Sequence, residues 1–266
     1  MEDARLPAAV ERPAGRRPFL RWSLMAVVLV VYVESIRVTQ VDVGKLLRGL
    51  PTMGGWITEA WPPDTQDLSS ILARSVETIA IALVGTTLAC IVALVVCVPA
   101  ARNLTPGPLL RLPARLLLNT MRGVDSFVFA LLFVAAVGLG PFAGMLGVAI
   151  HSAGSIGKLF AEAIEGMPPG PMEAAELTGA SRLKTVVAVL APDALPSLAS
   201  VALYMFEFNI RSSIVLGVVG AGGIGQQLKN SLDLLDFSRL FTILVVILVM
   251  VTGVDQMSSR IRARLA

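Results

Sequence analysis

Long apolar runs alternate with short polar stretches along most of the chain. A transmembrane helix needs about 20 mainly apolar residues, and about six of these runs approach that length. We place the runs at roughly residues 20–37, 74–101, 115–138, 142–164, 195–219 and 239–257. The pattern therefore predicts an all-α polytopic membrane protein with about six transmembrane helices.

The stretches between the runs are rich in turn-forming residues. Three prolines fall within residues 104–113, which we expect to form a loop, and the glycines and proline of residues 138–141 predict a tight turn. Residues 38–70 carry further prolines, paired glycines and two tryptophans. Because tryptophan favours the membrane edge, this segment is either an external loop or an interfacial segment, with Thr58–Trp61 as a candidate re-entrant or surface helix.

The composition also favours a membrane protein. Hydrophobic residues make up 55% of the chain, charged residues 15%, and the mean hydropathy is +0.76, whereas soluble domains rarely exceed about half apolar residues. The pI near 9.2 does not indicate nucleic-acid binding. With the N-terminus inside, 15 of the 22 lysines and arginines fall on the cytoplasmic side, as the positive-inside rule predicts. These are Arg5, Arg12, Arg16, Arg17, Arg21, Arg102, Arg111, Arg115, Arg122, Lys158, Arg182, Lys184, Arg260, Arg262 and Arg264.

The longest polar interruption in the second half of the chain is residues 165–196. Pro171 suits the first turn of a helix, and Gly179 suits a left-handed helix end. Ser181 can cap a second short helix, which Pro192 would end. Neither helix is long enough to cross a bilayer, so one interpretation of the segment is a connector that lies in the membrane interface.

The same segment resembles the cytoplasmic EAA loop of ABC importer permeases. The resemblance implies a type I ABC importer permease fold in which this loop is the coupling helix, which docks onto a separate ATPase subunit. Two positions depart conservatively from the family's pattern, with Val189 for isoleucine and Ala191 for leucine. The residues to which the resemblance assigns ATPase coupling are Glu173, Ala174, Ala175, Gly179, Ala180, Ser181, Val189 and Pro192.

Charged residues lie inside the fifth apolar run, in the sequence FEFNIRSS. A charge at membrane depth costs about 2.5 kcal/mol or more, and it is kept where it meets a partner or a water-filled path. Glu207 and Arg211 are four residues apart with the acid first, an order that favours an ion pair along one helix. Either they fix helix packing in this way, or they line a translocation path in which Arg211 meets an anion.

The single histidine, His151, lies in a helix rich in small residues that suits close packing. It is either a hydrogen-bonded interior residue or, with neighbouring serines and Lys158, a donor to an oxyanion. Residues 138–162 and the FEFNIR stretch resemble phosphonate permeases. This resemblance makes five residues candidates for the translocation pathway: His151, Glu207, Asn209, Arg211 and Ser212.

The segment that follows, GAGGIG, satisfies the dinucleotide-binding pattern G-x-G-x-x-G. That pattern binds a dinucleotide only between a strand and a helix, and here it follows an apolar helical run. We expect its glycines to let helices break or approach closely. Methionine, osmoprotectant and phosphonate permeases carry a similar segment near their external gate, which makes Gly220, Gly222, Gly223 and Gly225 gate candidates.

Three other features have plainer interpretations. Asp125 is expected at the inner mouth of the path, although relatives tend to carry Pro-Glu where this chain has Val124-Asp125. Glu77 is expected to be an interfacial charge near Arg74. Cys90 and Cys97 are seven residues apart in one helix, about 10 Å along its axis, so they are packing residues and not a disulfide or a metal site.

The chain shows no catalytic set and no phosphate-binding loop of the form GxxxxGK[ST], so we expect it not to be an enzyme and to bind no cofactor. We divide it into a cytoplasmic basic arm (1–21), a first transmembrane helix with a periplasmic segment (22–70) and the importer transmembrane domain (71–264). The resemblance implies a homodimer in the bacterial inner membrane with both termini cytoplasmic. It also implies two ATPase subunits that hold ATP and Mg²⁺, and a periplasmic or lipoprotein substrate-binding protein.

The expected ligand is a phosphonate or a related phosphorus oxyanion. Alternatives are an importer of phosphate or phosphite, methionine or an osmoprotectant. A different class of protein, an ATP-independent channel or secondary transporter, would be indicated by inverted repeats with broken midplane helices, and the sequence shows none.

Overall fold

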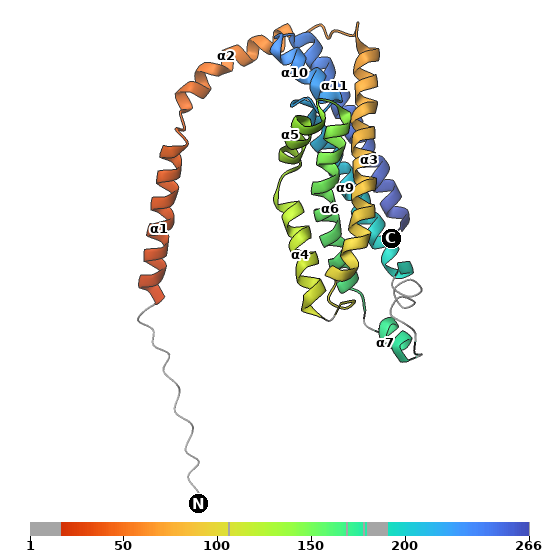
Figure 1. The fold of residues 1–266 in the computed structure, drawn as a ribbon. Coiled ribbons are helices and arrows are strands. Elements are labelled where there is room, and N and C mark those ends of the chain that lie inside the picture. Colours follow the sequence, from red (N-terminus) through yellow and green to blue (C-terminus); the bar gives the residue numbers. More distant parts are fainter. Residues whose placement is uncertain (1–16, 106, 169, 178, 180–190, 266) are drawn as a thin grey trace, which may run out of the picture. The chain divides into compact units, whose positions relative to one another are not determined.

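The computed structural model describes residues 17–105, 107–168, 170–177, 179 and 191–265, and all regular structure in these residues is α-helical. The all-α prediction is therefore confirmed. The helices (Figure 1) are α1 (Arg17–Val38), α2 (Val43–Glu59), α3 (Leu68–Ala100), α4 (Pro108–Gly123), α5 (Ser126–Val137), α6 (Pro141–Glu165), α7 (Gly170–Leu177), α9 (Ala191–Gly217), α10 (Ile224–Asp233) and α11 (Phe237–Leu265).

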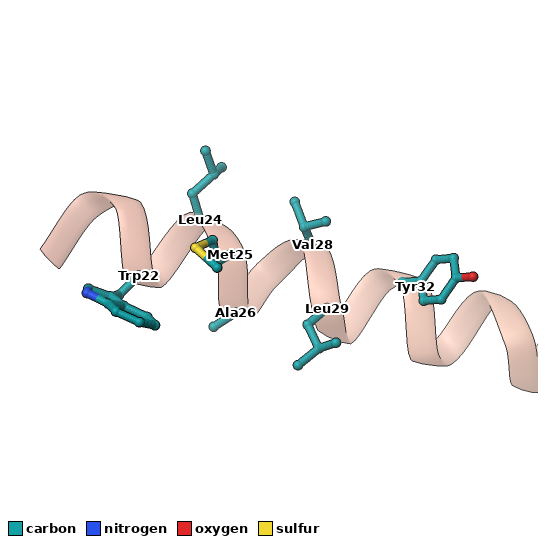
Figure 2. A pocket seen from close by; sticks show the side chains of 7 residues that line it. All are labelled: Trp22, Leu24, Met25, Ala26, Val28, Leu29 and Tyr32. Carbon is teal, nitrogen blue, oxygen red and sulfur yellow. The ribbon is translucent and has the colours of Figure 1, made fainter. Parts of the chain in front are cut away.

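The chain divides into two compact units, Met1–Gly55 and Trp56–Ala266. In the first unit, α1 and α2 meet at a bend of 47°. A groove of about 610 Å³ lies against α1 and is lined by that helix alone. Figure 2 shows its lining: Trp22, Leu24, Met25, Ala26, Val28, Leu29 and Tyr32. Because a ligand site needs a few polar groups to orient its ligand, this mainly apolar groove does not indicate a binding pocket.

In the second unit, α6 is the central helix and packs against α3, α4, α5 and α9. The helices approach closely because small residues face each other across the contacts, as is typical of membrane bundles. A side chain at Gly147 would collide with the backbone of Ala130 on α5, and one at Gly154 with the backbone of Arg122 on α4. Buried alanines of α3 and α6, including Ala89, Ala93 and Ala153, fill the core between them.

Two helices, α3 and α11, are by themselves long and apolar enough to cross a membrane, and up to four spans result if each bent helix pair counts as one. Each of the six predicted runs coincides with helix, but a count of six spans stays a prediction. The third run needs correction. The expected loop at 104–113 is helical from Pro108, because proline is tolerated in a first turn, and α4 and α5 then meet at 83°.

Of the two interpretations of residues 38–70, the external loop is wrong for the first half, because α2 occupies most of it, and the interfacial segment stays a prediction. The candidate helix Thr58–Trp61 contains only the last residues of α2. The segment that follows is fixed to the start of α11: the Ser238 hydroxyl donates to the carbonyls of Glu59 and Pro62, and Arg239 pairs with Asp67 at 3.0 Å. These contacts hold the entry of α3 beside α11.

Candidate functional site

Glu207 and Arg211 of α9 both pair with residues of α11. Arg262 of α11 donates to Glu207 at 2.6 Å, and the Glu207 side chain is 9% exposed. Arg211 pairs with Asp255 of α11 at 3.3 Å. The prediction that Glu207 and Arg211 pair with each other is therefore wrong. Their spacing permits a pair along the helix, but α11 packs on this face of α9 and supplies an opposite charge to each residue.

Asn209 lies on a different side of α9 and is 1% exposed. Its side-chain amide donates to the Thr86 hydroxyl of α3 at 2.8 Å, and its carbonyl accepts from the Ser152 hydroxyl of α6 at 2.8 Å. Thr86 and Ser152 are also buried. The candidate pathway residue Asn209 therefore joins three helices inside the bundle and is closed to a ligand in this conformation.

His151 is partly buried between two elements. Its Nδ1 is 2.9 Å from the carbonyl oxygen of Val124, and its ring stacks on Phe208 of α9 with centroids 6.4 Å apart. Ser212 is within hydrogen-bond distance of Ser126, at 2.7 Å between the hydroxyl oxygens. Both contacts lie at the break between α4 and α5. The two candidates thus connect α6 and α9 to this break.

The break itself is made by Asp125, which caps α5. Its carboxylate accepts from the Phe127 backbone N–H at 2.8 Å, the bond expected of an N-cap aspartate. Its carboxylate is therefore engaged in ending one helix and beginning the next. The pairing of Glu77 with Arg74 is confirmed at 2.6 Å. Cys97 is buried in the core and Cys90 partly buried, as expected of packing residues.

The glycine segment forms the connection from α9 to α10. Gly220, Gly222 and Gly223 have φ of +86°, +81° and +73°, a left-handed region that residues with side chains rarely adopt. The segment is tied to α3, because Glu77 accepts from the Gly223 N–H at 3.2 Å and Thr78 accepts from the Ile224 N–H at 2.8 Å. Close approach and a break in the helix are both confirmed here.

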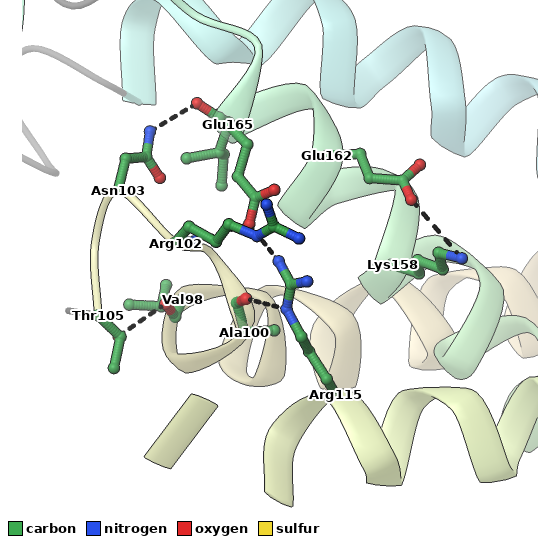
Figure 3. A network of polar contacts seen from close by, with 10 residues as sticks. Val98, Ala100, Arg102, Asn103, Thr105, Arg115, Lys158, Glu162 and Glu165 are labelled. Carbon is green, nitrogen blue, oxygen red and sulfur yellow. Dashed lines mark hydrogen bonds and ion pairs between the residues drawn. The ribbon is translucent and has the colours of Figure 1, made fainter. Parts of the chain in front are cut away.

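At the opposite end of the bundle, polar groups join the ends of α3 and α6 to α4 (Figure 3). Glu165, the last residue of α6, accepts from the Arg102 backbone N–H at 2.7 Å and pairs with the guanidinium of Arg115. Arg115 also donates to the Ala100 carbonyl at 2.9 Å, which satisfies an end group of α3. We name Arg102, Arg115 and Glu165 the α6-end cluster. It borders a cavity of about 200 Å³ that also contains Lys158 and Glu162.

The helix α7 continues the chain from this cluster and carries Glu173, Ala174 and Ala175 of the predicted coupling motif. Gly179 has φ +71°, as expected of a glycine that ends a helix. Pro192 is exposed in the first turn of α9, so the fifth apolar run begins about one turn earlier than predicted. Ala180, Ser181 and Val189, with the predicted second helix, lie outside the described residues.

Asp255 was not predicted as a site residue, and the ion pairs of Arg262 and Arg115 were not predicted either. Asp255 is an acid within a long apolar helix, which was the available signal. The partners themselves are set by packing between helices that are 44 to 55 residues apart in the sequence.

Comparison with known proteins identifies relatives over most of the chain. The family model for the inner membrane component of binding-protein-dependent transport systems matches residues 85–266. HtxC of Stutzerimonas stutzeri, a permease protein named for phosphite transport, is 45% identical over 96% of this chain and 90% of its own length. The phosphite transport system permease protein PtxC of the same organism is 42% identical over 83% of this chain and 80% of its own.

The fold is similar to that of a chain of the MetNI methionine ABC transporter, solved in inward-facing conformations. The TM-score is 0.67 at 23% identity, and the match covers 76% of this chain and all of the other.

Proposed function

Because the chain belongs to the family of binding-protein-dependent transport system inner membrane components, we propose that it is the permease of an ATP-driven importer for a phosphonate or a related phosphorus oxyanion. Members of this family are transport permeases and not enzymes. The observation that carries the ligand class is Arg211, a half-exposed cation within a membrane helix. The names of the relatives, which refer to phosphite, support the same class.

We further propose the arrangement in the membrane. Two copies of the chain would enclose one path, and two ATPase subunits would bind at the end that bears α7. ATP and Mg²⁺ would be held by those subunits, while this chain binds no cofactor. A periplasmic or lipoprotein binding protein would deliver the ligand at the glycine-segment end. The basic residues of the α6-end cluster support a cytoplasmic location of the α7 end. We propose that both termini are cytoplasmic as well.

Alternating access is the proposed mechanism. ATP binding draws the ATPase subunits together, and α7 passes their movement to α6. The α6-end cluster fixes the end of α6 to α3 and α4, so the three helices respond together. The path then opens toward the binding protein, and hydrolysis with product release resets it.

The experiment that tests the function is a tagged purification from the native host in mild detergent, followed by mass spectrometry and reconstitution into proteoliposomes. We expect two permeases with two ATPases, and ATP-dependent uptake of phosphite, phosphate or methylphosphonate when the binding protein is present. Uptake of methionine alone would show that the ligand belongs to another chemical class. A chain that is isolated without an ATPase even after cross-linking in the membrane would support a channel or secondary transporter.

The variant Gly179→Leu tests the proposed coupling of ATP hydrolysis to transport. The positive φ of Gly179 disfavours any side chain, so this variant should assemble but lose the link between ATP turnover and uptake. Gly166→Ala is a matched control, because Gly166 ends α6 with φ −79°. Coupled uptake at the wild-type level in Gly179→Leu would contradict the assigned role.

A further inference from the structure

The two ion pairs between α9 and α11 differ in closeness and exposure. Arg262 and Glu207 lie 2.6 Å apart with Glu207 nearly buried. In the other pair, one guanidinium nitrogen of Arg211 lies 3.4 and 3.3 Å from the two carboxylate oxygens of Asp255. The side chains of Arg211 and Asp255 are 46% and 42% exposed.

The Arg211–Asp255 contact is loose by the standards of its chemistry. Charge-assisted N–H···O bonds are usually about 2.7–2.9 Å long, and the strongest arginine–carboxylate pairs use two nitrogens against two oxygens. Here both oxygens share a single nitrogen at longer range. A guanidinium has five N–H donors, and within the described part of the chain no other acceptor engages Arg211. Its remaining donors are open to a second acceptor.

We propose that Asp255 is a specificity-determining residue for the ligand, acting as the counter-charge that a tetrahedral oxyanion displaces from Arg211. This inference rests on the proposed function and names the group against which the ligand competes. Without ligand, Asp255 neutralises Arg211 and lowers the cost of holding a cation at membrane depth. When an oxyanion arrives, its oxygens accept hydrogen bonds from the open N–H donors of Arg211 and then replace the Asp255 carboxylate.

The competition has two consequences for transport. A doubly charged oxyanion is attracted to Arg211 more strongly than the singly charged carboxylate is, so it can displace Asp255 where a neutral or zwitterionic ligand cannot. The carboxylate also returns when the ligand leaves, so binding stays weak and release stays fast. A tight pair such as Glu207–Arg262 could not serve in this way, because its carboxylate is buried and closely held.

The test measures weak binding directly on the permease–ATPase complex in lipid nanodiscs, without binding protein. The probe is phosphite, followed by ³¹P NMR line broadening. Asp255→Asn removes the competing charge, so we expect the half-saturating phosphite concentration to fall about fivefold, on the order of what a pair of this exposure contributes. Arg211→Gln should abolish the broadening, and the double variant should behave like Arg211→Gln.

Controls separate this role from a packing role. Asp233→Asn on α10 removes another exposed acid, one that pairs with Lys229, and it should leave phosphite binding unchanged. Asp255→Thr repeats the charge removal with a different side chain in case the asparagine variant does not assemble. Unchanged or weaker binding in the assembled Asp255 variants, with wild-type binding intact, would overturn the inference alone. Absence of both phosphite binding and oxyanion uptake in the wild type would overturn the proposed function as well.

Discussion

The substitution Asn209→Leu tests whether the central polar contact of the bundle has a structural role. Leucine has the same branched side-chain skeleton as asparagine, so the change removes the hydrogen bonds to Thr86 and Ser152 without opening a large cavity. Hydrogen bonds between membrane helices contribute about 0.6 kcal/mol on average and up to ~1.7 each. The Thr86 hydroxyl still donates to the Ala82 carbonyl, at 2.6 Å, which limits the loss on that side. We therefore expect a loss of about 1–2 kcal/mol.

For a chain of this size, that loss lowers an unfolding midpoint by about 2–8 °C. The assay is thermal unfolding of the detergent-solubilised complex, followed by size-exclusion chromatography after heating at one fixed rate. Asn230→Leu on the exposed surface of α10 is the matched control and should leave the midpoint unchanged. An unchanged midpoint in Asn209→Leu together with abolished uptake would refute the reasoning, because it would place Asn209 in contact with the ligand.

Three further predictions concern close contacts. Gly147→Leu should lower the same midpoint strongly, because the new Cβ would lie 2.8 Å from the Ala130 nitrogen, and overpacking costs about 1–3 kcal/mol. Gly253→Leu on α11 should leave the midpoint unchanged, because the space around Gly253 is open. Gly223→Ala should lower the midpoint by a few degrees, since a left-handed φ costs other residues about 1–2 kcal/mol, and a wild-type midpoint would speak against a strained segment. Arg115→Ala should reduce uptake per ATP hydrolysed in proteoliposomes, because Glu165 loses its ion pair with α4 and the Ala100 carbonyl loses the Arg115 donor. Arg111→Ala on the same helix should keep the wild-type ratio.

Local sequence signals predicted the long apolar helices, but not α2, α10 or the division of the third run into α4 and α5. Apolar run length located α3, α6, α9 and α11, and Gly179 has the positive φ that was expected of a left-handed helix end. The break between α4 and α5 was missed because Asp125 follows a glycine and a valine inside a largely apolar run. The bond by which Asp125 caps α5 is local, however, because it joins Asp125 to Phe127. Aspartate is a preferred capping residue, so Asp125 followed by Ser126 was the signal that could have revealed the break.

The partners of the intramembrane charges could not be predicted in this way. Arg211 has Glu207 within reach along its own helix, and one sequence gives no measure of what packs against that helix. Asp255 and Arg262 come from α11, and their selection depends on the crossing of two helices. The partners of Asn209 could not be predicted either, because Ser152 and Thr86 are 57 and 123 residues away in the sequence.

The contacts of α9 determine which of its movements are compatible with transport. Asn209 fixes it to α3 and α6, and Glu207 fixes it to α11, in each case through a short contact of a buried side chain. A slide of α9 by one turn, about 5.4 Å, would break all of these contacts at once. A rigid rotation of the four helices together would break none of them. If α7 receives the movement of the ATPase subunits, as we propose, we therefore expect it to be expressed as rotation of this unit. On the same proposal, the loosely paired Arg211 is the charge on α9 that stays available to an anion while the unit turns.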